Sequence, residues 1–406
     1  MTIPSRIGAL IRWIRALPSL LAVCVVALLA SLTFSANAFA AEAGSGLRLT
    51  VGGDATTVFS KSQNACDPAD IPDAPARAIR IVSGTVQLYA THFHNRRLVG
   101  PDLLHLSNDC HIIFAGGERD DPAAFDDRAW IASLYTEDGR TIFAAVHNEF
   151  QGHRRPALCP SGRYMDCWYN AVTAAVSHDE GAHFSRLVAD ADLIAALPYR
   201  YAEVTGRHAG YFNPSNMVLQ NGMLSMMVFA TGVRAQRSGN CLLRTDRISD
   251  PSAWRAWDGT GYGVSFVDPY GASVSPDAHV CEPVGAGKLR WPVTSLVRHA
   301  PTGLFIALMM NAARDGGVFY STSPDLLDWS SPAKLMGGSG GGVYQCGDSA
   351  PLAYPSLLDP NSEDRNFMTV GKSAELFLTR FNVTDCRISM DRDLIRMPIA
   401  ISAARN

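Results

Sequence analysis

The chain has 406 residues, of which 47% are hydrophobic and 18% are charged. This composition supports at least one large core, and it excludes a disordered, fibrous or polytopic membrane protein. Its 35 basic and 38 acidic side chains give a formal net charge of -3. No basic run is interleaved with aromatic residues, so we expect no nucleic acid partner. The 34 glycines and 23 prolines favour many turns and an all-β fold.

Residues 1–40 have the order of a secretory signal peptide. Three arginines precede an apolar run from Leu17 to Phe34, and alternating small residues lead to Ala40, near which we expect cleavage. The alternative is an uncleaved membrane anchor, because about 18 apolar residues can just span a bilayer. We expect a secreted or periplasmic protein without stable membrane insertion after cleavage. The sequence indicates no oligomeric state.

Eight cysteines remain after the predicted cleavage, an even number that favours disulfides in an exported chain. Pairing in sequence order closes only short loops and is our expectation. No pair has the C-x-x-C spacing of a zinc site, so zinc binding is the weaker alternative, and we expect neither a metal nor an organic cofactor. The predicted disulfides are Cys66 with Cys110, Cys159 with Cys167, Cys241 with Cys281, and Cys346 with Cys386.

A unit of about 70 residues recurs five times along the chain. Each unit has a first strand, a strongly apolar second strand that ends in a polar residue, and a third strand closed by an aspartate. The closing aspartates are Asp102, Asp179, Asp246, Asp325 and Asp391. The predicted first strands are 77–81, 130–133, 211–215, 291–295 and 354–357, and the second strands are 86–91, 142–146, 224–230, 305–310 and 376–379.

This repeat predicts a five-bladed β-propeller over residues 76–406, preceded by an N-terminal leader over residues 41–75. Three or four strands in a unit of this length match one propeller blade with enlarged loops. The alternative is a two-domain β-sandwich whose turns are similar by coincidence.

The closing segment Ser323–Trp329 and the blade pattern resemble the five-bladed propeller glycosidases of the arabinanase, levansucrase and invertase superfamily. This resemblance implies a funnel on the propeller axis with three carboxylates from different blades. The Trp-x-Asn-Asp-Pro segment of the invertases is missing, and the predicted first strand Arg77–Ile81 contains no carboxylate, so a complete catalytic set is not carried over. Residues Ser177–Phe184 also resemble the Asp box of sialidases, which is a structural turn on the outside of a propeller.

Glycosidic bond cleavage requires one carboxylic acid and one carboxylate, held about 5–10 Å apart. The predicted second strand of the second blade runs apolar and then breaks into His147, Asn148 and Glu149. Such a polar cluster beside a buried strand is either a structural network or a ligand site. We expect Glu149 to be catalytic, with His147 and Asn148 binding hydroxyl groups. Asp127, which precedes the second blade, and Glu282, beside Cys281, are the further catalytic candidates.

Polar residues also interrupt apolar runs at comparable places in other blades, which is the pattern expected around a funnel that binds a polar substrate. His92 and His94 share a strand face, but no third metal ligand accompanies them, so hydrogen-bonded histidines are the preferred interpretation. The further predicted substrate-binding residues are His92, Asn213, Asn311 and Arg380.

The sequence therefore predicts an exported glycoside hydrolase-like protein that acts on an unidentified oligosaccharide or polysaccharide with water as co-substrate. Two alternatives remain open at this stage: a noncatalytic carbohydrate-binding propeller, and a structural propeller at the cell surface. Two carboxylates that face each other across an axial funnel would favour the enzyme.

Overall fold

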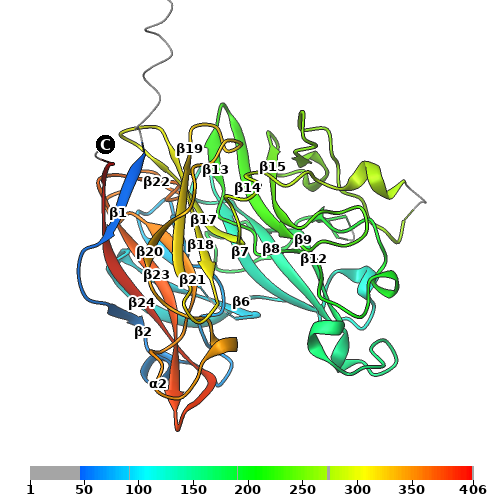
Figure 1. Cartoon of the computed structure of the whole chain (residues 1–406), viewed down its shortest axis with the longest axis horizontal. Helices are drawn as coiled ribbons and strands as arrows, with labels where there is room; N and C mark the ends of the chain where they lie inside the picture. The colour runs from blue at the N-terminus through cyan, green and yellow to red at the C-terminus, as the bar shows by residue number, and fades with distance from the viewer. Residues whose placement is uncertain (1–45, 91, 190, 272–274, 405–406) are drawn as a thin grey trace, which may run out of the picture. The chain divides into compact units, whose positions relative to one another are not determined.

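The computed structural model describes residues 46–90, 92–189, 191–271 and 275–404. The predicted signal peptide therefore lies outside the described residues. Residues Arg48–Ser402 form one compact unit, and five antiparallel blades follow one another within it. The five-bladed propeller predicted from the sequence is confirmed by this strand pairing. Figure 1 shows the paired strands β8 and β9 beside each other.

The first two blades contain the strands that hold the candidate site. Blade 1 has the strand order β3-β4-β5-β6, and blade 2 places β8 between β7 and β9, with two short strands on the outer side of β9. The strands of blade 1 are β3 (Arg77–Arg80), β4 (Val86–Tyr89), β5 (His94–Asp102) and β6 (His105–Ala115), and those of blade 2 are β7 (Arg128–Tyr135), β8 (Ile142–Gln151), β9 (Trp168–Ser177), β10 (Ser185–Arg186) and β11 (Leu193–Ala195).

Blades 3 and 4 repeat the antiparallel order, and blade 3 also joins blade 2 through a short parallel pairing of β12 with β9. Blade 3 consists of β12 (Ala209–Phe212), β13 (Val218–Gln220), β14 (Met223–Ala230), β15 (Gly239–Thr245) and β16 (Arg255–Ala256), and blade 4 consists of β17 (Val293–His299), β18 (Phe305–Asn311), β19 (Gly317–Ser323) and β20 (Ala333–Met336), with β22 (Thr369–Val370) added in parallel to β17.

Blade 5 is completed by strands from the N-terminal part of the described chain. Its own strands are β21 (Leu352–Leu358), β23 (Ser373–Thr384) and β24 (Arg387–Ala403). Both β1 (Leu47–Val51) and β2 (Thr56–Phe59) pair with β24, so segments far apart in sequence share one sheet. The predicted leader thus contributes strands to the propeller, because β24 is long enough to pair with β23 on one side and with β1 and β2 on the other.

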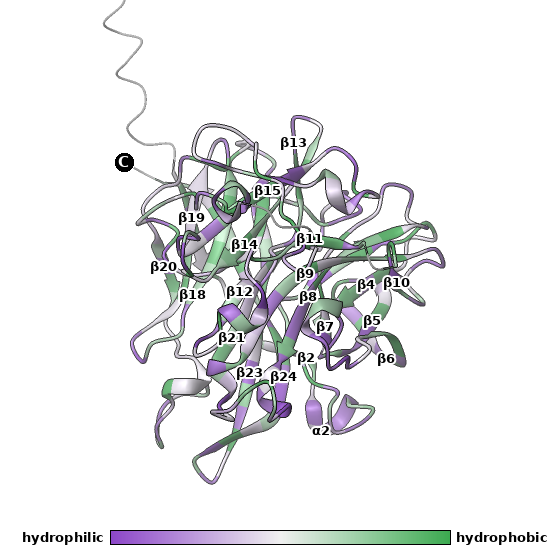
Figure 2. Cartoon of the chain, turned by 90° about the vertical axis from the view of Figure 1, so that its right-hand side faces the viewer, coloured by the Kyte–Doolittle hydropathy of each residue, from purple (hydrophilic) through white to green (hydrophobic). Residues whose placement is uncertain are grey.

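The core lies along the strands because their alternating and continuous apolar residues pack between neighbouring blades. β14 illustrates this pattern: Met226, Met227 and Val228 are completely buried. In Figure 2 hydrophobic residues run along strands such as β14, whereas the short helix α2 (Lys61–Asn64) is hydrophilic. No helix among the described residues is long and apolar enough to cross a membrane.

All four predicted disulfides are confirmed. The Cα atoms are 5.5 Å apart in Cys66–Cys110, 5.8 Å in Cys159–Cys167, 5.9 Å in Cys241–Cys281 and 4.8 Å in Cys346–Cys386. These distances suit a disulfide, and each bond closes a loop of the length expected from pairing in sequence order.

Most of the predicted closing aspartates follow a third strand, as expected. In blade 2 the Ser177 hydroxyl donates to Asp179 Oδ1 at 2.7 Å and accepts from the Gly181 amide at 2.9 Å, which builds the predicted structural turn. Ser323 and Asp325 repeat this contact in blade 4 at 3.2 Å. The prediction for Asp391 is wrong: this residue lies near the start of β24, where it accepts a hydrogen bond from Asn382 across the hairpin at 2.9 Å.

Candidate active site

Glu149 lies near the end of β8, the central strand of blade 2. Residues along a strand alternate between its two faces, so His147, Glu149 and Gln151 share one face, whereas Asn148 and Phe150 point the other way. β8 is paired along this segment with β7 on one side and β9 on the other. The two-sided pairing holds the carboxylate on a rigid element rather than on a loop.

Both carboxylate oxygens of Glu149 have partners. His147 Nε2 lies 3.1 Å from Glu149 Oε1. The Gln151 side-chain amide donates to Glu149 Oε2 at 2.9 Å, and the Tyr164 hydroxyl donates to the same oxygen at 3.3 Å. Burial and the charge of Glu149 raise the pKa of Tyr164, which keeps that hydroxyl protonated as a donor. The surroundings of Glu149 therefore suit an ionised carboxylate.

Asp73 brings a second carboxylate from the loop that precedes β3. Its backbone amide is anchored to the carbonyl of Ala90 at 3.0 Å. The Tyr354 hydroxyl donates to Asp73 Oδ1 at 3.1 Å, the Arg392 guanidinium donates to the same oxygen, and His92 Nε2 lies 3.7 Å from Oδ2. Blades 1 and 5 thus both contribute to the position of this carboxylate.

Burial raises the pKa of Asp73, and the nearby charge of Glu149 raises it further, while Arg392 and Tyr354 oppose the change by stabilising the ionised form. Both residues line the same cavity, so the charge of Glu149 acts on the Asp73 carboxyl and disfavours its ionisation. Two buried carboxylates that interact favour a state in which one of them keeps a proton, and this is the arrangement that acid–base catalysis uses.

Asp73 and Glu149 line one cavity of about 210 Å³. The cavity lies where the first strands of several blades converge, and its walls are mainly aromatic. Two of its residues, Asn213 and Tyr354, have backbone φ angles of 51° and 56°, a left-handed conformation that is uncommon for residues other than glycine and gathers at functional sites. The lining residues are Asp73, Ala74, Pro75, Trp130, Ala132, His147, Glu149, Trp168, His208, Phe212, Asn213, Pro214 and Tyr354.

One wall of the cavity is a stack of rings. The Trp168 and His208 rings are nearly parallel, with an angle of 13° and centroids 4.0 Å apart, and Tyr164 stacks on Trp168 with centroids 4.8 Å apart. Tyr164 comes from the short loop closed by the Cys159–Cys167 disulfide. Burial lowers the pKa of His208 to about 4, so this ring is neutral at pH 7 and belongs to an apolar surface.

Arg77, at the start of β3, closes the propeller axis beneath the cavity. Its guanidinium donates to the carbonyl oxygens of Ala132 in blade 2, Pro214 in blade 3 and Thr294 in blade 4 at 2.7, 3.0 and 2.8 Å. It also donates to Ser356 Oγ in blade 5 at 3.3 Å. Ala132 and Pro214 line the cavity as well, so the hydrogen-bonded hub formed by Arg77 lies directly at the cavity floor.

Three of the predicted substrate-binding residues lie at or beside this cavity. His147 and Asn213 line it, and His92, which is not among the described lining residues, lies with its Nε2 3.7 Å from Asp73 Oδ2. Asn148 does not share the cavity, because it occupies the opposite face of β8, where its amide donates to Thr173 Oγ1. The two neighbours of Glu149 that the sequence suggested are therefore divided by the alternation of the strand.

Asp127 is buried and directly precedes Arg128, which pairs with Glu149 across β7 and β8, but its carboxylate belongs to a separate ion pair. Its carboxylate receives two hydrogen bonds from Arg155, at 2.8 and 2.9 Å, and one from the backbone amide of Gln151 at 2.8 Å. Asp127 is not among the described residues that line the cavity. It holds the end of β8, from which Gln151 reaches Glu149, and it has no open side toward a substrate.

The three remaining predicted residues are also absent from the described lining of the cavity. Glu282 pairs with Arg237, and both side chains are partly or largely exposed. Asn311 accepts a hydrogen bond from the Ala313 amide at 3.0 Å and so shapes a turn. Arg380 pairs with Asp393 at 2.8 Å. A polar residue at the end of a second strand thus has different tasks in different blades.

Asp73 is the main residue that sequence reasoning missed. For blade 1 the sequence prediction considers carboxylates only within the strand that starts at Arg77, and Asp73 lies four residues before that strand. For blade 2 it also considers residues ahead of the strand, and so it selects Asp127. If residues ahead of the first strand are included in blade 1 as in blade 2, Asp73 is selected. Nothing in the local sequence indicates its partners Tyr354 and Arg392 from blade 5.

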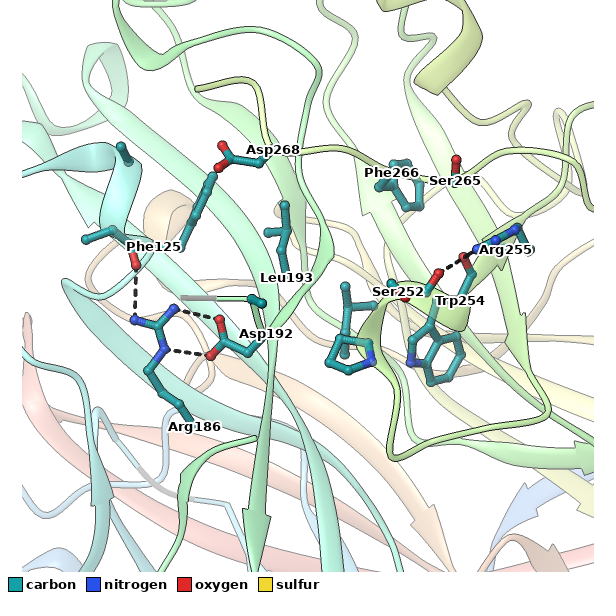
Figure 3. Close-up of a pocket in the computed structure, with 15 residues that line it drawn as sticks. Phe125, Arg186, Asp192, Leu193, Ser252, Trp254, Arg255, Ser265, Phe266 and Asp268 are labelled. Atoms are coloured by element: carbon teal, nitrogen blue, oxygen red, sulfur yellow. Dashed lines mark hydrogen bonds and ion pairs between the residues drawn. The ribbon is translucent and has the colours of Figure 1, made fainter. Parts of the chain in front are cut away.

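A larger surface cavity of about 700 Å³ lies between the outer strands of blade 2 and the region around β16 (Figure 3). Its carboxylate Asp192 receives hydrogen bonds from Arg186 at 2.7 and 2.6 Å, and Figure 3 shows these two side chains facing each other. Asp268 accepts a hydrogen bond from the Tyr270 amide at 2.9 Å. No carboxylate interaction comparable to that of Asp73 with Glu149 occurs among its described lining residues, so the smaller axial cavity is the better candidate for chemistry.

No group of three or more His, Cys, Asp or Glu side chains in the described part of the chain is arranged to hold a metal ion.

No family model matches the sequence, and no curated protein matches it. Solved structures that are similar include a family 117 glycoside hydrolase from Zobellia galactanivorans, with 10% identity and a TM-score of 0.48 over 88% of this chain and 90% of that chain. The catalytic domain of a GH62 α-L-arabinofuranosidase from Coprinopsis cinerea gives 9% identity and a TM-score of 0.48 over 88% of this chain and 98% of that chain. An α-L-arabinanase from Cellvibrio cellulosa gives 12% identity and a TM-score of 0.44 over 80% of this chain and 91% of that chain. The similarity to these three proteins concerns the fold, which the strand pairing of this chain establishes by itself.

Proposed function

We propose that the protein is a glycoside hydrolase that cleaves an oligosaccharide or polysaccharide with Asp73 and Glu149. The observation that carries the proposal is that these two buried carboxylates come from different blades and line the same axial cavity. Hydrolysis of a glycosidic bond needs such a pair, one to protonate the leaving oxygen and one to attack or to activate water.

The surroundings of the pair divide the two tasks. The pKa of Asp73 is raised by burial and by the charge of Glu149, so Asp73 retains a proton more readily and acts as the general acid. Glu149 accepts hydrogen bonds from Gln151 and Tyr164, as an ionised carboxylate does, and acts as the base or nucleophile. The proton of Asp73 passes to the glycosidic oxygen as that bond breaks, and water supplies the hydroxyl group of the product.

The aromatic walls suit the remaining surface of a sugar. A sugar ring presents C–H groups on its faces and hydroxyl groups at its edge, and Trp130 and Phe212 offer apolar ring surfaces beside the polar atoms of Asn213 and the two carboxylates. This mixture of ring faces and a few polar groups also favours the second candidate function, a protein that binds carbohydrate without cleaving it.

We further propose that the chain is exported. Support comes from the order of residues 1–40, in which arginines are followed by an apolar run and then by small residues, as in a signal peptide. The four disulfides of the described chain also support export. Intact mass of the protein isolated from its own cell would show a mature chain that begins near Ala41. A full-length chain retained in the membrane would contradict cleavage.

The test of the function is a panel of plant, microbial and capsular polysaccharides, incubated with the wild-type protein and assayed for new reducing ends. The proposal predicts release from at least one member, and loss of that release in the double variant Asp73→Asn/Glu149→Gln. Glu282→Gln is the matched control, since Glu282 pairs with Arg237 outside the described lining of the cavity. Binding of a polysaccharide by the wild type without any release of reducing ends would favour the noncatalytic function.

A further inference from the structure

The axial cavity is small, and its boundaries are rigid. Its volume of about 210 Å³ lies below the range of about 300–1,000 Å³ that is usual for pockets that hold drug-sized molecules. A single sugar ring fits a space of this size, whereas a chain of several rings does not. The number of sugar units that the site accepts is therefore set by what surrounds the cavity.

The floor is closed by the Arg77 hub. Because one guanidinium donates to groups from blades 2, 3, 4 and 5, the centre of the propeller offers no passage to a polymer below the cavity. Arg77 is only 2% exposed, and burial lowers its pKa to about 9, so it remains charged at pH 7. A ligand can enter from the rim but cannot thread through the axis.

One side is closed by the stack of Tyr164, Trp168 and His208. Each ring is supported by the next, and Tyr164 is also hydrogen-bonded to Glu149 at 3.3 Å. The short Cys159–Cys167 loop carries Tyr164 and is tied to the start of β9 by its disulfide. This wall leaves little room for a sugar chain to continue past Glu149 on that side.

Groups from blades 1 and 5 surround Asp73. Tyr354 and Arg392 contact Asp73, and Arg392 lies over the Phe381 ring at 4.6 Å from its centroid. Asp73 and Glu149 are therefore each held by supported side chains, and both line the same sugar-sized cavity.

From the small volume of the cavity and its closed floor we infer that the protein acts on chain ends, and that the cavity receives one terminal glycosyl unit beside the stack of Tyr164, Trp168 and His208. The inference rests on the proposed function and adds the substrate class, namely glycosides with an accessible terminal unit. Internal units of a polysaccharide would require the chain to leave the cavity in two directions, which the wall and the blade 5 contacts oppose.

Two sets of probes separate action on chain ends from internal cleavage: 4-nitrophenyl monoglycosides of pentoses and hexoses in both anomeric forms together with short oligosaccharides, and dye-cross-linked polysaccharides. We expect single sugars or nitrophenol to be released from members of the first set, with no dye made soluble from the second. Release of soluble dyed fragments would overturn the inference and leave the proposed function intact. No hydrolysis of any probe, together with no binding of the probes to Asp73→Asn, would overturn the proposed function and this inference with it.

Variants of the wall test where the sugar lies. On a hydrolysed monoglycoside, Trp168→Ala should raise KM by at least about tenfold, because the ring stack that walls the cavity loses its central member, whereas Trp168→Phe should stay within about threefold of wild type. Trp291→Ala, which removes a ring packed on Phe319 in blade 4, is the control and should leave KM unchanged. If Trp168→Ala does not fold, Phe212→Ala removes another lining ring and should raise KM similarly. An unchanged KM in the folded variant would overturn the placement of the sugar.

Discussion

The Tyr354 hydroxyl donates a hydrogen bond to Asp73 Oδ1 at 3.1 Å across 281 residues of sequence. Tyr354 lies in the first strand of blade 5, and Asp73 precedes the first strand of blade 1, so the contact joins the two ends of the ring of blades at the candidate site. The position of the carboxylate therefore depends on closure of the propeller as a whole.

Tyr354→Phe should shift the pH dependence of the reaction. The hydrogen bond from Tyr354 lowers the pKa of Asp73, so its removal should raise that pKa further. If Asp73 is the general acid, the alkaline limb of kcat/KM should move to higher pH, which a pH–rate profile of the purified variant measures. Tyr344→Phe, outside the described cavity lining, is the control. A movement of that limb to lower pH would contradict the assignment of Asp73 as the acid.

His208 should make the protein less stable in acid. Burial lowers the pKa of His208 to about 4 from 6.5, so the folded chain binds fewer protons at this site than the unfolded chain as pH falls between those values. The free energy of unfolding should therefore fall with pH in this window, by up to about 1.4 kcal/mol per pH unit for this group.

Urea unfolding of His208→Gln between pH 7 and pH 4 measures this contribution. The variant should show a flatter dependence of the unfolding free energy on pH than the wild type. His178→Gln changes an exposed histidine and should retain the wild-type slope. Identical slopes for His208→Gln and the wild type would rule out His208 as the source.

Arg77→Met should destabilise the protein by about 3 kcal/mol or more, because the buried carbonyl groups of three blades lose a charged donor. The free energy of unfolding from urea titration is the measurement. Arg298→Met, which removes an exposed arginine bonded only within its own turn to Gly303 among the described contacts, should change it by less than about 0.5 kcal/mol. Equal effects of the two variants would show that the hub does not hold the blades together.

Removal of the Cys159–Cys167 disulfide should affect both stability and the site. Closing a loop of this length contributes about 2–3 kcal/mol, less any strain. Because the loop also carries Tyr164 onto Glu149, Cys159→Ser/Cys167→Ser should lower activity per folded molecule as well as the melting temperature. Cys66→Ser/Cys110→Ser removes a disulfide whose cysteines are outside the described lining of the cavity, and it should affect only the melting temperature. Loss of activity in proportion to unfolding in both variants would contradict a role for the loop.

The fold could be predicted from the sequence because each blade repeats the same order of strands and turns. Local patterns indicate the second strands, whose apolar runs are bounded by glycine, asparagine and aspartate. Cysteine pairing in sequence order is only the simplest of the possible pairings, because it closes short loops. Asp391 was misplaced because the hairpin of β23 and β24 is longer than in other blades, so an aspartate that resembles a closing residue lies at the start of a strand.

The site could be predicted only in part. Glu149 and His147 stand out because polar side chains are rare at the end of an apolar strand. Asp73 does not end an apolar strand and is marked only by its place ahead of the first strand of blade 1. Its partner Arg392 is 319 residues away in sequence, and only the circular arrangement of the blades brings the two together. The convergence of five blades on Arg77 is likewise a property of the closed ring that no short segment contains.

The most direct test of the account is the turnover of Glu149→Gln, measured with its melting temperature on the same preparation. The substitution keeps the shape and the hydrogen-bonding capacity of the side chain but removes its charge. On any glycoside that the wild type cleaves, kcat should fall by two to four orders of magnitude while the melting temperature stays close to that of the wild type. A folded Glu149→Gln variant that keeps more than about a tenth of wild-type turnover would contradict the assignment of Glu149 to catalysis.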